Sequence, residues 1–302
     1  MRFLAIGECM AELSPGSQAG AFSLGFAGDT FNTAWYLAQL ALQDEVAYFT
    51  ALGDDALSQD LHAFIADSGL DAEHVQQVPG ATVGLYMISL KDGERSFSYW
   101  RGQSAARQLA DDPVALGNAM ARADVVYVSG ITLAILDAPA RNTFLETLKN
   151  ARAAGKTIAF DPNLRPRLWQ SGAEMCEAVM QCAEISDLVL PSFEDEADWF
   201  KDASVQATAE RYLNVGAKSV VVKNGAGAVY FQTTDAKGKV PVEPAAQVVD
   251  TTAAGDSFNA GILAGLSGSD PLEAAIRSAC ALSKQVVQGK GALVPFDPES
   301  VL

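Results

Sequence analysis

Short apolar runs of strand length alternate with segments of helical periodicity, and this alternation restricts the chain to few folds. The runs lie at 2–7, 46–50, 124–129, 157–160, 187–190 and 219–222, and helical patterns lie at 30–42, 55–68, 139–153, 173–184, 204–214, 255–266 and 270–288. Continuous Val, Ile and Leu strands between helices predict an α/β fold with a mostly parallel sheet covered on both faces. Ligands of such sheets bind at the carboxyl ends of the strands.

Two early stretches, at about 10–26 and 82–101, interrupt this alternation. Segments 83–90 and 95–100 alternate in polarity, and Asp92-Gly93 between them is a hairpin signal. We therefore expect a single domain over 1–302 with these segments inserted as a small antiparallel sheet, a candidate lid. Exposed edges of that sheet could pair two copies of the chain in a homo-oligomer.

Composition limits the partners and the compartment. A formal net charge of -16, without a run of Lys or Arg, argues against nucleic acid. No apolar run approaches the roughly 18 residues of a membrane helix, and the opening stretch is too short for a signal peptide, so we expect no membrane and a cytoplasmic location. The same charge repels ATP, so a nucleotide site must rely on backbone dipoles and a divalent cation.

The segment 248–258 carries the strongest chemical signal. A strand-like lead is followed by small residues and then by a long helix with Asp256 at its start. Small residues allow close approach to a ligand, the N–H groups of a helix start favour an anion, and a carboxylate there can accept a proton from a hydroxyl. The alternative is a tight turn in which Asp256 is only the N-cap of the helix.

The string Asp-Thr-Thr-Ala-Ala-Gly-Asp-Ser-Phe at 250–258 resembles the signature of the ribokinase, or PfkB-type, carbohydrate kinase family. The resemblance implies a ribokinase-like three-layer α/β/α domain with a small β-sheet lid. It also implies that Asp256 is the catalytic base, that Ala253, Ala254 and Gly255 form an anion hole with it and contact the nucleotide, and that Asp250 is a supporting acid at the metal. The family usually has glycine where this chain has Ala253; alanine keeps the N–H, so we expect the anion hole to survive.

The family's amino-terminal pattern of paired glycines followed by Asn has a counterpart at 28–34. Asp29 replaces the second glycine. The resemblance implies that Gly28, Asp29 and Asn32 contact sugar hydroxyls, and a capped helix is the alternative.

The segment 219–230 resembles the family's Lys-x-Gly-x-x-Gly segment beside the nucleotide, and the chain has no P-loop motif. ATP and Mg²⁺ are the implied cofactors, with a monovalent cation as a further candidate. The family's magnesium-linked Asn-x-x-Glu motif lacks its Asn at 191–196, where Glu194, Asp195 or Glu196 could act through water or form only an acidic first helical turn. The implied nucleotide contacts are Ser192, Lys223, Gly225, Ala226, Gly227 and Lys290, the last in a segment that could equally be a helix-ending turn. The implied metal residues are Asp250 and Glu196.

Two arginines suggest an acidic sugar. Arg101 ends a lid strand and Arg165 follows a core strand, so both could converge on a carboxylate, which guanidinium groups bind in a bidentate way. Tyr86 and Tyr99 either contact the sugar acid or form the apolar centre of the lid. The resemblance is closest to family members that phosphorylate the terminal (6-) hydroxyl of 2-dehydro-3-deoxy-D-gluconate; a neutral-sugar kinase and a non-catalytic sugar-binding regulator are the alternatives.

Overall fold

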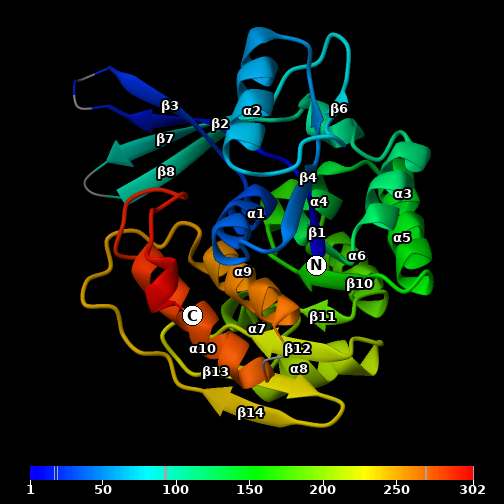
Figure 1. Ribbon diagram of the computed structural model, residues 1–302, viewed down its shortest axis with the longest axis vertical. Coiled ribbons are helices and arrows are strands. Elements are labelled where there is room, and N and C mark those ends of the chain that lie inside the picture. The colour runs from blue at the N-terminus through cyan, green and yellow to red at the C-terminus, as the bar shows by residue number, and fades with distance from the viewer. Residues whose placement is uncertain (17, 19, 92–93, 269–270, 302) are drawn as a thin grey trace.

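The computed structural model describes residues 1–302 except 17, 19, 92–93, 269–270 and 302. Its largest element is a twisted sheet with the strand order β14-β13-β12-β11-β10-β9-β1-β4 (Figure 1). The strands from β4 to β12 run parallel, and β13 and β14 form an antiparallel edge. These strands are β1 (Arg2–Ile6), β4 (Glu45–Phe49), β9 (Val125–Ser129), β10 (Thr157–Asp161), β11 (Leu188–Val189), β12 (Ser219–Val222), β13 (Val229–Thr233) and β14 (Lys237–Val240). The mostly parallel sheet predicted from the apolar runs is confirmed.

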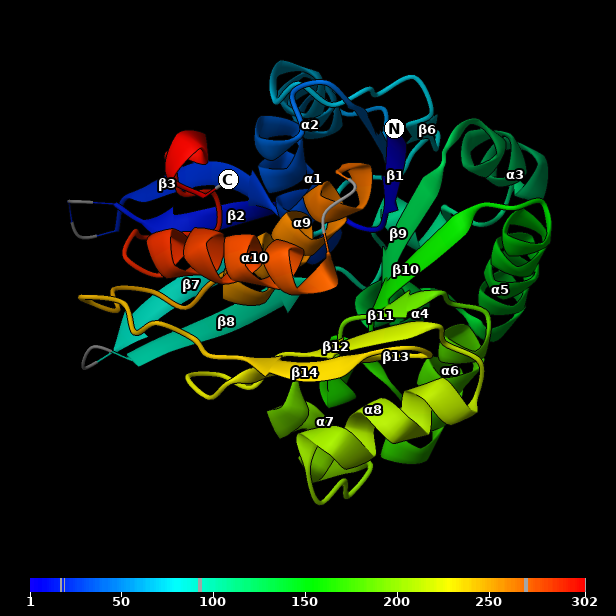
Figure 2. The same ribbon diagram turned by 60° about the horizontal axis from the view of Figure 1, so that its bottom comes forward.

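Helices cover both faces of this sheet. Helices α10 and α8 lie on opposite faces of β12–β14 (Figure 2). One face packs against α1 (Asp29–Leu40), α2 (Ala56–Asp67), α9 (Ala254–Ser267) and α10 (Leu272–Val286). The other packs against α3 (Pro113–Arg122), α4 (Gly130–Ile135), α5 (Ala138–Ala153), α6 (Gly172–Glu184), α7 (Phe193–Trp199) and α8 (Val205–Asn214).

Alternating side chains within one strand explain this three-layer arrangement. In β12, Val220 and Val222 join the core on the α5/α8 side, whereas Val221 joins the core on the α9/α10 side. All three are buried. Successive residues of a strand point to opposite faces, so a continuous apolar run requires cover on both sides.

A smaller sheet with the order β3-β2-β7-β8 projects from the body beside α1 and α2 (Figure 1). Its strands are β2 (Met10–Pro15), β3 (Phe22–Ala27), β7 (Leu85–Lys91) and β8 (Glu94–Trp100). The predicted antiparallel pairing of β7 with β8 is confirmed, and the Asp92-Gly93 turn lies outside the described residues. A short parallel pair, β5 (Ala51–Leu52) with β6 (Gln76–Gln77), completes the strands described here.

The helix starts differ in one respect that bears on function. Several helices begin at an Asp or Ser whose side chain accepts a backbone N–H, as is usual. These caps are Asp55, Asp112, Ser129, Asp137, Ser171 and Ser204. Among the residues the structure describes, no side chain caps α1, α7, α9 or α10. Of these, α1 and α9 begin after Gly28 and Ala253. In α9 the Ala254 N–H donates to the Thr251 carbonyl at 3.2 Å, and the next two N–H groups, of Gly255 and Asp256, have no acceptor in the described part of the chain.

Candidate active site

A cavity of about 430 Å³ opens at the carboxyl edge of the sheet, under the smaller sheet. Its size falls within the range of small-molecule sites. The starts of α1 and α9, the loops after β10 and β12, and residues of the smaller sheet line it. The lining residues are Met10, Ala27, Gly28, Asp29, Asn32, Tyr86, Phe97, Tyr99, Ile131, Asp161, Asn163, Arg165, Ser192, Asp195, Lys223, Thr251, Thr252, Ala253, Ala254, Gly255, Asp256 and Ala292.

Asp256 lies in the first turn of α9 and does not cap it. The N-cap residue is Ala253, whose φ of 58° is left-handed, a conformation that glycine adopts more readily than alanine. The Asp256 carboxylate instead accepts a hydrogen bond of 2.8 Å from Asn32 Nδ2 in α1. The alternative of Asp256 as an N-cap is therefore wrong. The start of α9, which no side chain caps, therefore lines the cavity next to the Asp256 carboxylate, and Asn32 of α1 holds that carboxylate in place.

The environment of Asp256 favours a protonated carboxyl. Burial, and then the negative charge of Asp29, raise the pKa of Asp256 to about 8, although the Asn32 hydrogen bond and Lys223 act in the opposite direction. A carboxylate whose pKa lies near neutral pH is well suited to accept a proton from a hydroxyl and release it afterwards.

The start of α1 brings the other predicted sugar contacts to the same place. Gly28 N donates to Asn32 Oδ1 over 3.3 Å, which orients the amide that holds Asp256. Asp29 accepts a hydrogen bond of 2.7 Å from Asn163 Nδ2. A side chain at Gly28 would meet the Glu8 carbonyl oxygen at 2.1 Å, so the close contact of α1 with the segment after β1 requires glycine here.

The end of β10 contributes residues for which the sequence patterns predicted no role. Asp161 is buried and accepts hydrogen bonds from Lys223 Nζ at 3.0 Å and Asn259 Nδ2 at 2.7 Å. Asp161 and Asn163 follow a predicted strand at its ligand-facing end, a signal that could have identified them. Asn259 is three residues after Asp256 in α9, and no feature of the sequence alone pointed to it.

The sequence matches the pfkB family of carbohydrate kinases over residues 2–299. It is 37% identical to a 2-dehydro-3-deoxygluconokinase of Haemophilus influenzae, over 96% of this chain and 94% of that protein. It is 39% identical to the enzyme of the same name from Dickeya dadantii, over 97% and 96% of the two chains. A fructokinase of Xylella fastidiosa, solved with bound ATP, superposes with a TM-score of 0.82 at 26% identity, covering 96% of this chain and 93% of that one.

This chain belongs to the pfkB family of carbohydrate kinases. The predicted ribokinase-like α/β fold and the predicted kinase class are confirmed by these matches. The kinase has no helix, in its described parts, that is long and apolar enough to cross a membrane.

The smaller sheet presents aromatic side chains to the cavity of the kinase. Tyr86 is buried, donates its hydroxyl hydrogen to Glu12, and packs against Tyr99 with ring centroids 5.8 Å apart. Tyr99 is 54% exposed. Both tyrosines line the cavity and contact each other, so the two roles weighed for them from sequence are compatible.

The two predicted arginines occupy different positions. Arg165 lines the cavity, is exposed, and forms an ion pair of 3.7 Å with Asp195. Arg101 is not a lining residue; its guanidinium forms an ion pair with the buried carboxylate of Glu8, between β1 and β2. The convergence of the two arginines on one carboxylate therefore stays a prediction, and in this structure Glu8 is the partner of Arg101.

The predicted nucleotide residues divide into two groups. Lys223 and Ser192 line the cavity, together with the 253–255 backbone. Gly225, Ala226 and Gly227 form the predicted turn between β12 and β13, where Gly225 has a φ of 53° and Gly227 N donates to the Asn224 carbonyl at 2.7 Å. This turn and Lys290 are not among the lining residues, so their contact with ATP stays a prediction.

The predicted metal residues are held by the protein itself. Asp250 binds the Thr252 amide and hydroxyl through one oxygen and the Gly291 amide, at 2.7 Å, through the other, which joins the loop before α9 to the turn after α10. Glu196 is fully buried between Arg211 and Tyr212, and burial raises its pKa to about 7. Both Glu196 oxygens have protein partners away from the cavity, which argues against direct ligation.

Of the three acids in that segment, Asp195 is the one that lines the cavity. Burial raises its pKa. Asp195 lies three residues after Ser192, so the two have the spacing of the Asn-x-x-Glu motif, with Ser in place of Asn and Asp in place of Glu. No cluster of three His, Cys, Asp or Glu side chains suited to a metal occurs among the described residues. Mg²⁺ commonly binds through one or two carboxylates plus phosphates and water, and Asp195 fits that mode.

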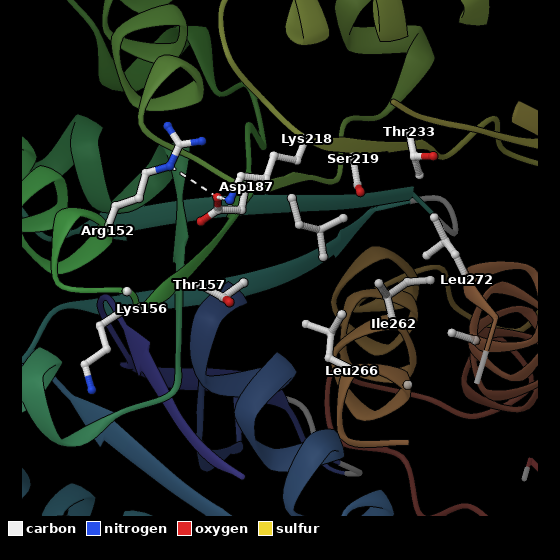
Figure 3. A pocket seen from close by; sticks show the side chains of 14 residues that line it. Arg152, Lys156, Thr157, Asp187, Lys218, Ser219, Thr233, Ile262, Leu266 and Leu272 are labelled. Carbon is white, nitrogen blue, oxygen red and sulfur yellow. Dashed lines mark hydrogen bonds and ion pairs between the residues drawn. The ribbon is translucent and has the colours of Figure 1, made fainter. Parts of the chain in front are cut away.

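A second hollow lies at the opposite, amino-terminal edge of the sheet, between the starts of β10–β12 and the helices α9 and α10 (Figure 3). Arg152 there reaches Asp187 across 3.2 Å, and its other nitrogens donate to the Glu184 and Gly216 carbonyls. Lys218 also pairs with Asp187. Arg152 and Lys218 therefore stabilise the contacts between neighbouring loops. The carboxylate suited to proton transfer, Asp256, lies in the first cavity.

Proposed function

We propose that this protein transfers the γ-phosphoryl group of ATP to the 6-hydroxyl of 2-dehydro-3-deoxy-D-gluconate. The observation that carries the proposal is Asp256, held by Asn32 at the uncapped start of α9 within the lined cavity. Relatives named 2-dehydro-3-deoxygluconokinase, at 37% and 39% identity over nearly the whole chain, support the choice of sugar.

In the proposed reaction Asp256 is the general base. The 6-hydroxyl gives its proton to the Asp256 carboxylate, the new bond forms between this oxygen and the γ-phosphorus, and the bond from that phosphorus to the β-phosphate oxygen breaks. The products are 2-dehydro-3-deoxy-6-phospho-D-gluconate and ADP. Asn32 keeps the carboxylate in position through its 2.8 Å hydrogen bond, so little reorganisation is needed in the transition state.

The backbone of 253–256 acts on the transferring group. The N–H groups of Gly255 and Asp256 and the positive end of α9 stabilise negative charge on the phosphoryl oxygens. Gly255 lines the cavity without a side chain, which leaves room for that group. A magnesium ion, held by the ATP phosphates and reached through water by Asp195, would supply further positive charge at the phosphates.

The substrate carboxylate is the proposed partner of Arg165. Its exposed guanidinium lies at the cavity, and both of its contacts, the Leu164 carbonyl at 2.7 Å and Asp195 at 3.7 Å, are made by Nη1. Its other N–H groups can therefore bind a carboxylate. Tyr86 and Tyr99 would cover the sugar from the lid side. Arg101 could bind the substrate carboxylate as well only if it shared or broke its ion pair with Glu8.

The small sheet has two further proposed roles. As a lid it would exclude water during transfer and so limit futile ATP hydrolysis. Its outer strands β3 and β8 carry exposed apolar side chains that could cover each other in a homodimer. These are Phe22, Leu24, Phe97, Tyr99 and Trp100. Because ATP is the phosphoryl donor, a cytoplasmic location forms part of the proposal.

The test is ADP release with Mg²⁺ and ATP on 2-dehydro-3-deoxygluconate, fructose, ribose and gluconate, for the wild type and Arg165→Ala. We expect turnover confined to the keto-deoxy acid. In the variant, kcat/KM should fall by about 10-fold or more, roughly what a charge-assisted hydrogen bond contributes. An equal fall in kcat/KM for fructose in the variant, or faster turnover of fructose by the wild type, would instead favour a neutral-sugar kinase. The ion pair of Arg101 with Glu8 supports this second candidate, because it leaves Arg101 less available to a substrate carboxylate.

A further inference from the structure

A buried polar cluster lies beneath the start of α9. It consists of Asp161 at the end of β10, Lys223 directly after β12, and Asn259 inside α9. Lys223 Nζ donates to Asp161 Oδ2 at 3.0 Å and to Asn259 Oδ1 at 3.1 Å, and Asn259 Nδ2 donates to the same Asp161 oxygen at 2.7 Å. The three side chains thus form a closed triangle of hydrogen bonds.

This triangle fixes the ammonium group close to the reacting centre. Lys223 Nζ lies 3.8 Å from the point where a Cβ on Gly255 would stand, and Lys223 lines the cavity. An ammonium group has three N–H donors. Two are used within the triangle, and the structure gives the third no acceptor in the described part of the chain.

The triangle is also connected to the base. Asn259 Nδ2 donates to Tyr127 OH at 3.0 Å, and Thr33 Oγ1 lies 3.3 Å from that hydroxyl and 3.2 Å from the Asp256 carbonyl oxygen. Asn259 and Asp256 are three residues apart in α9, on one side of the helix. The cation, the anion hole and the base therefore share one rigid frame.

We propose that Lys223 is a catalytic cation that donates its remaining N–H to the transferring phosphoryl group, and that Asp161 and Asn259 are positioning residues that hold it under the anion hole. The inference rests on the proposed kinase function and deepens it. A fixed positive charge helps most where negative charge develops in the transition state, in a site shielded from water.

Two other roles for Lys223 are open to test. It could bind the ATP phosphates equally in the ground state and the transition state, or it could serve only to neutralise the buried Asp161. The first role changes KM for ATP and leaves kcat, because uniform binding does not accelerate the chemical step. The second makes Lys223 dispensable once Asp161 is also neutral.

The experiment compares Lys223→Met, the double variant Lys223→Met/Asp161→Asn, Asn259→Ala and the wild type. Lys218→Met is the matched control. Lys218 lies directly before β12 and Lys223 directly after it, and Lys218 pairs with Asp187 at the opposite edge of the sheet. We measure kcat and KM for both substrates, the pH profile, and folding by circular dichroism. The acceptor is whichever sugar the wild type phosphorylates fastest, so a wrong substrate proposal appears in the wild type and leaves this comparison intact.

We expect Lys223→Met and the double variant to lose about 100-fold or more in kcat with both KM values within about 3-fold, and Asn259→Ala to lose about 10-fold. Because the Lys223 charge lowers the pKa of Asp256, the acidic limb of the pH profile should move to higher pH in Lys223→Met. In the double variant this upward shift should be absent, because the Asp161 charge that raises the same pKa is also removed. Unchanged kcat with a raised KM for ATP, or recovery of wild-type kcat in the folded double variant, would overturn the proposal.

Discussion

Replacing Asp256 with Asn should stabilise the protein while it greatly reduces turnover. The pKa of the Asp256 carboxyl rises from its ordinary 3.8 to about 8, first through burial and then through the charge of Asp29. The folded state therefore holds a proton that the unfolded state releases above pH 3.8. Stability is lost as the pH rises from the unfolded pKa towards the folded one. A neutral Asn keeps an oxygen for Asn32 and removes this pH-dependent loss.

The magnitude follows from about 1.4 kcal/mol for each unit of pKa. The stability gain of Asp256→Asn should be near zero at pH 4, grow by about that amount per pH unit, reach at most about 4 kcal/mol at pH 7, and level off above pH 8. Turnover should fall at least about 100-fold, the usual contribution of a general base.

Urea unfolding from pH 4 to pH 9 measures this gain, with the exposed Asp60→Asn as control. A gain that does not change with pH, or a variant less stable than the wild type at pH 7, would refute the assignment of a buried carboxyl with a raised pKa. The same pKa predicts that wild-type kcat/KM for the sugar rises with pH and levels off near pH 8.

Two backbone predictions follow from the helix starts. Ala253→Gly should raise the free energy of unfolding by up to about 1 kcal/mol without loss of activity, because it relieves the left-handed φ of 58°. Ala254→Gly, in the regular first turn of α9, should lower the free energy of unfolding. Urea unfolding in which Ala254→Gly is the more stable of the two variants would contradict this prediction. Gly28→Ala should cost about 2 kcal/mol and impair turnover, because its Cβ would meet the Glu8 carbonyl at 2.1 Å. Gly25→Ala, with open space around it, is the control, and equal stability of both variants would count against the close contact.

Much of the fold could be predicted because its signals are local. The apolar runs match the strands to within about two residues, since a strand buried on both faces needs continuous apolar residues. The small-residue string before Asp256 likewise predicted an open helix start, because close backbone approach is encoded in the residues themselves.

The partners of each charged side chain could not be read in this way. Asn32 and Asp256 are 224 positions apart, and only the packing of α1 against α9 joins them. Glu196 belonged to an acidic run that fitted a metal, yet the fold buries it against Arg211.

The sequence alone determined the class of this protein: an α/β kinase of the pfkB family with Asp256 at a helix start. The tertiary structure decided how the site works, through the state of the Asp256 proton, the Glu8 partner of Arg101 and the position of the Lys223 ammonium. The physical reason is that strand and helix signals repeat within a few residues, whereas burial and charge pairing depend on segments that meet only in the folded chain.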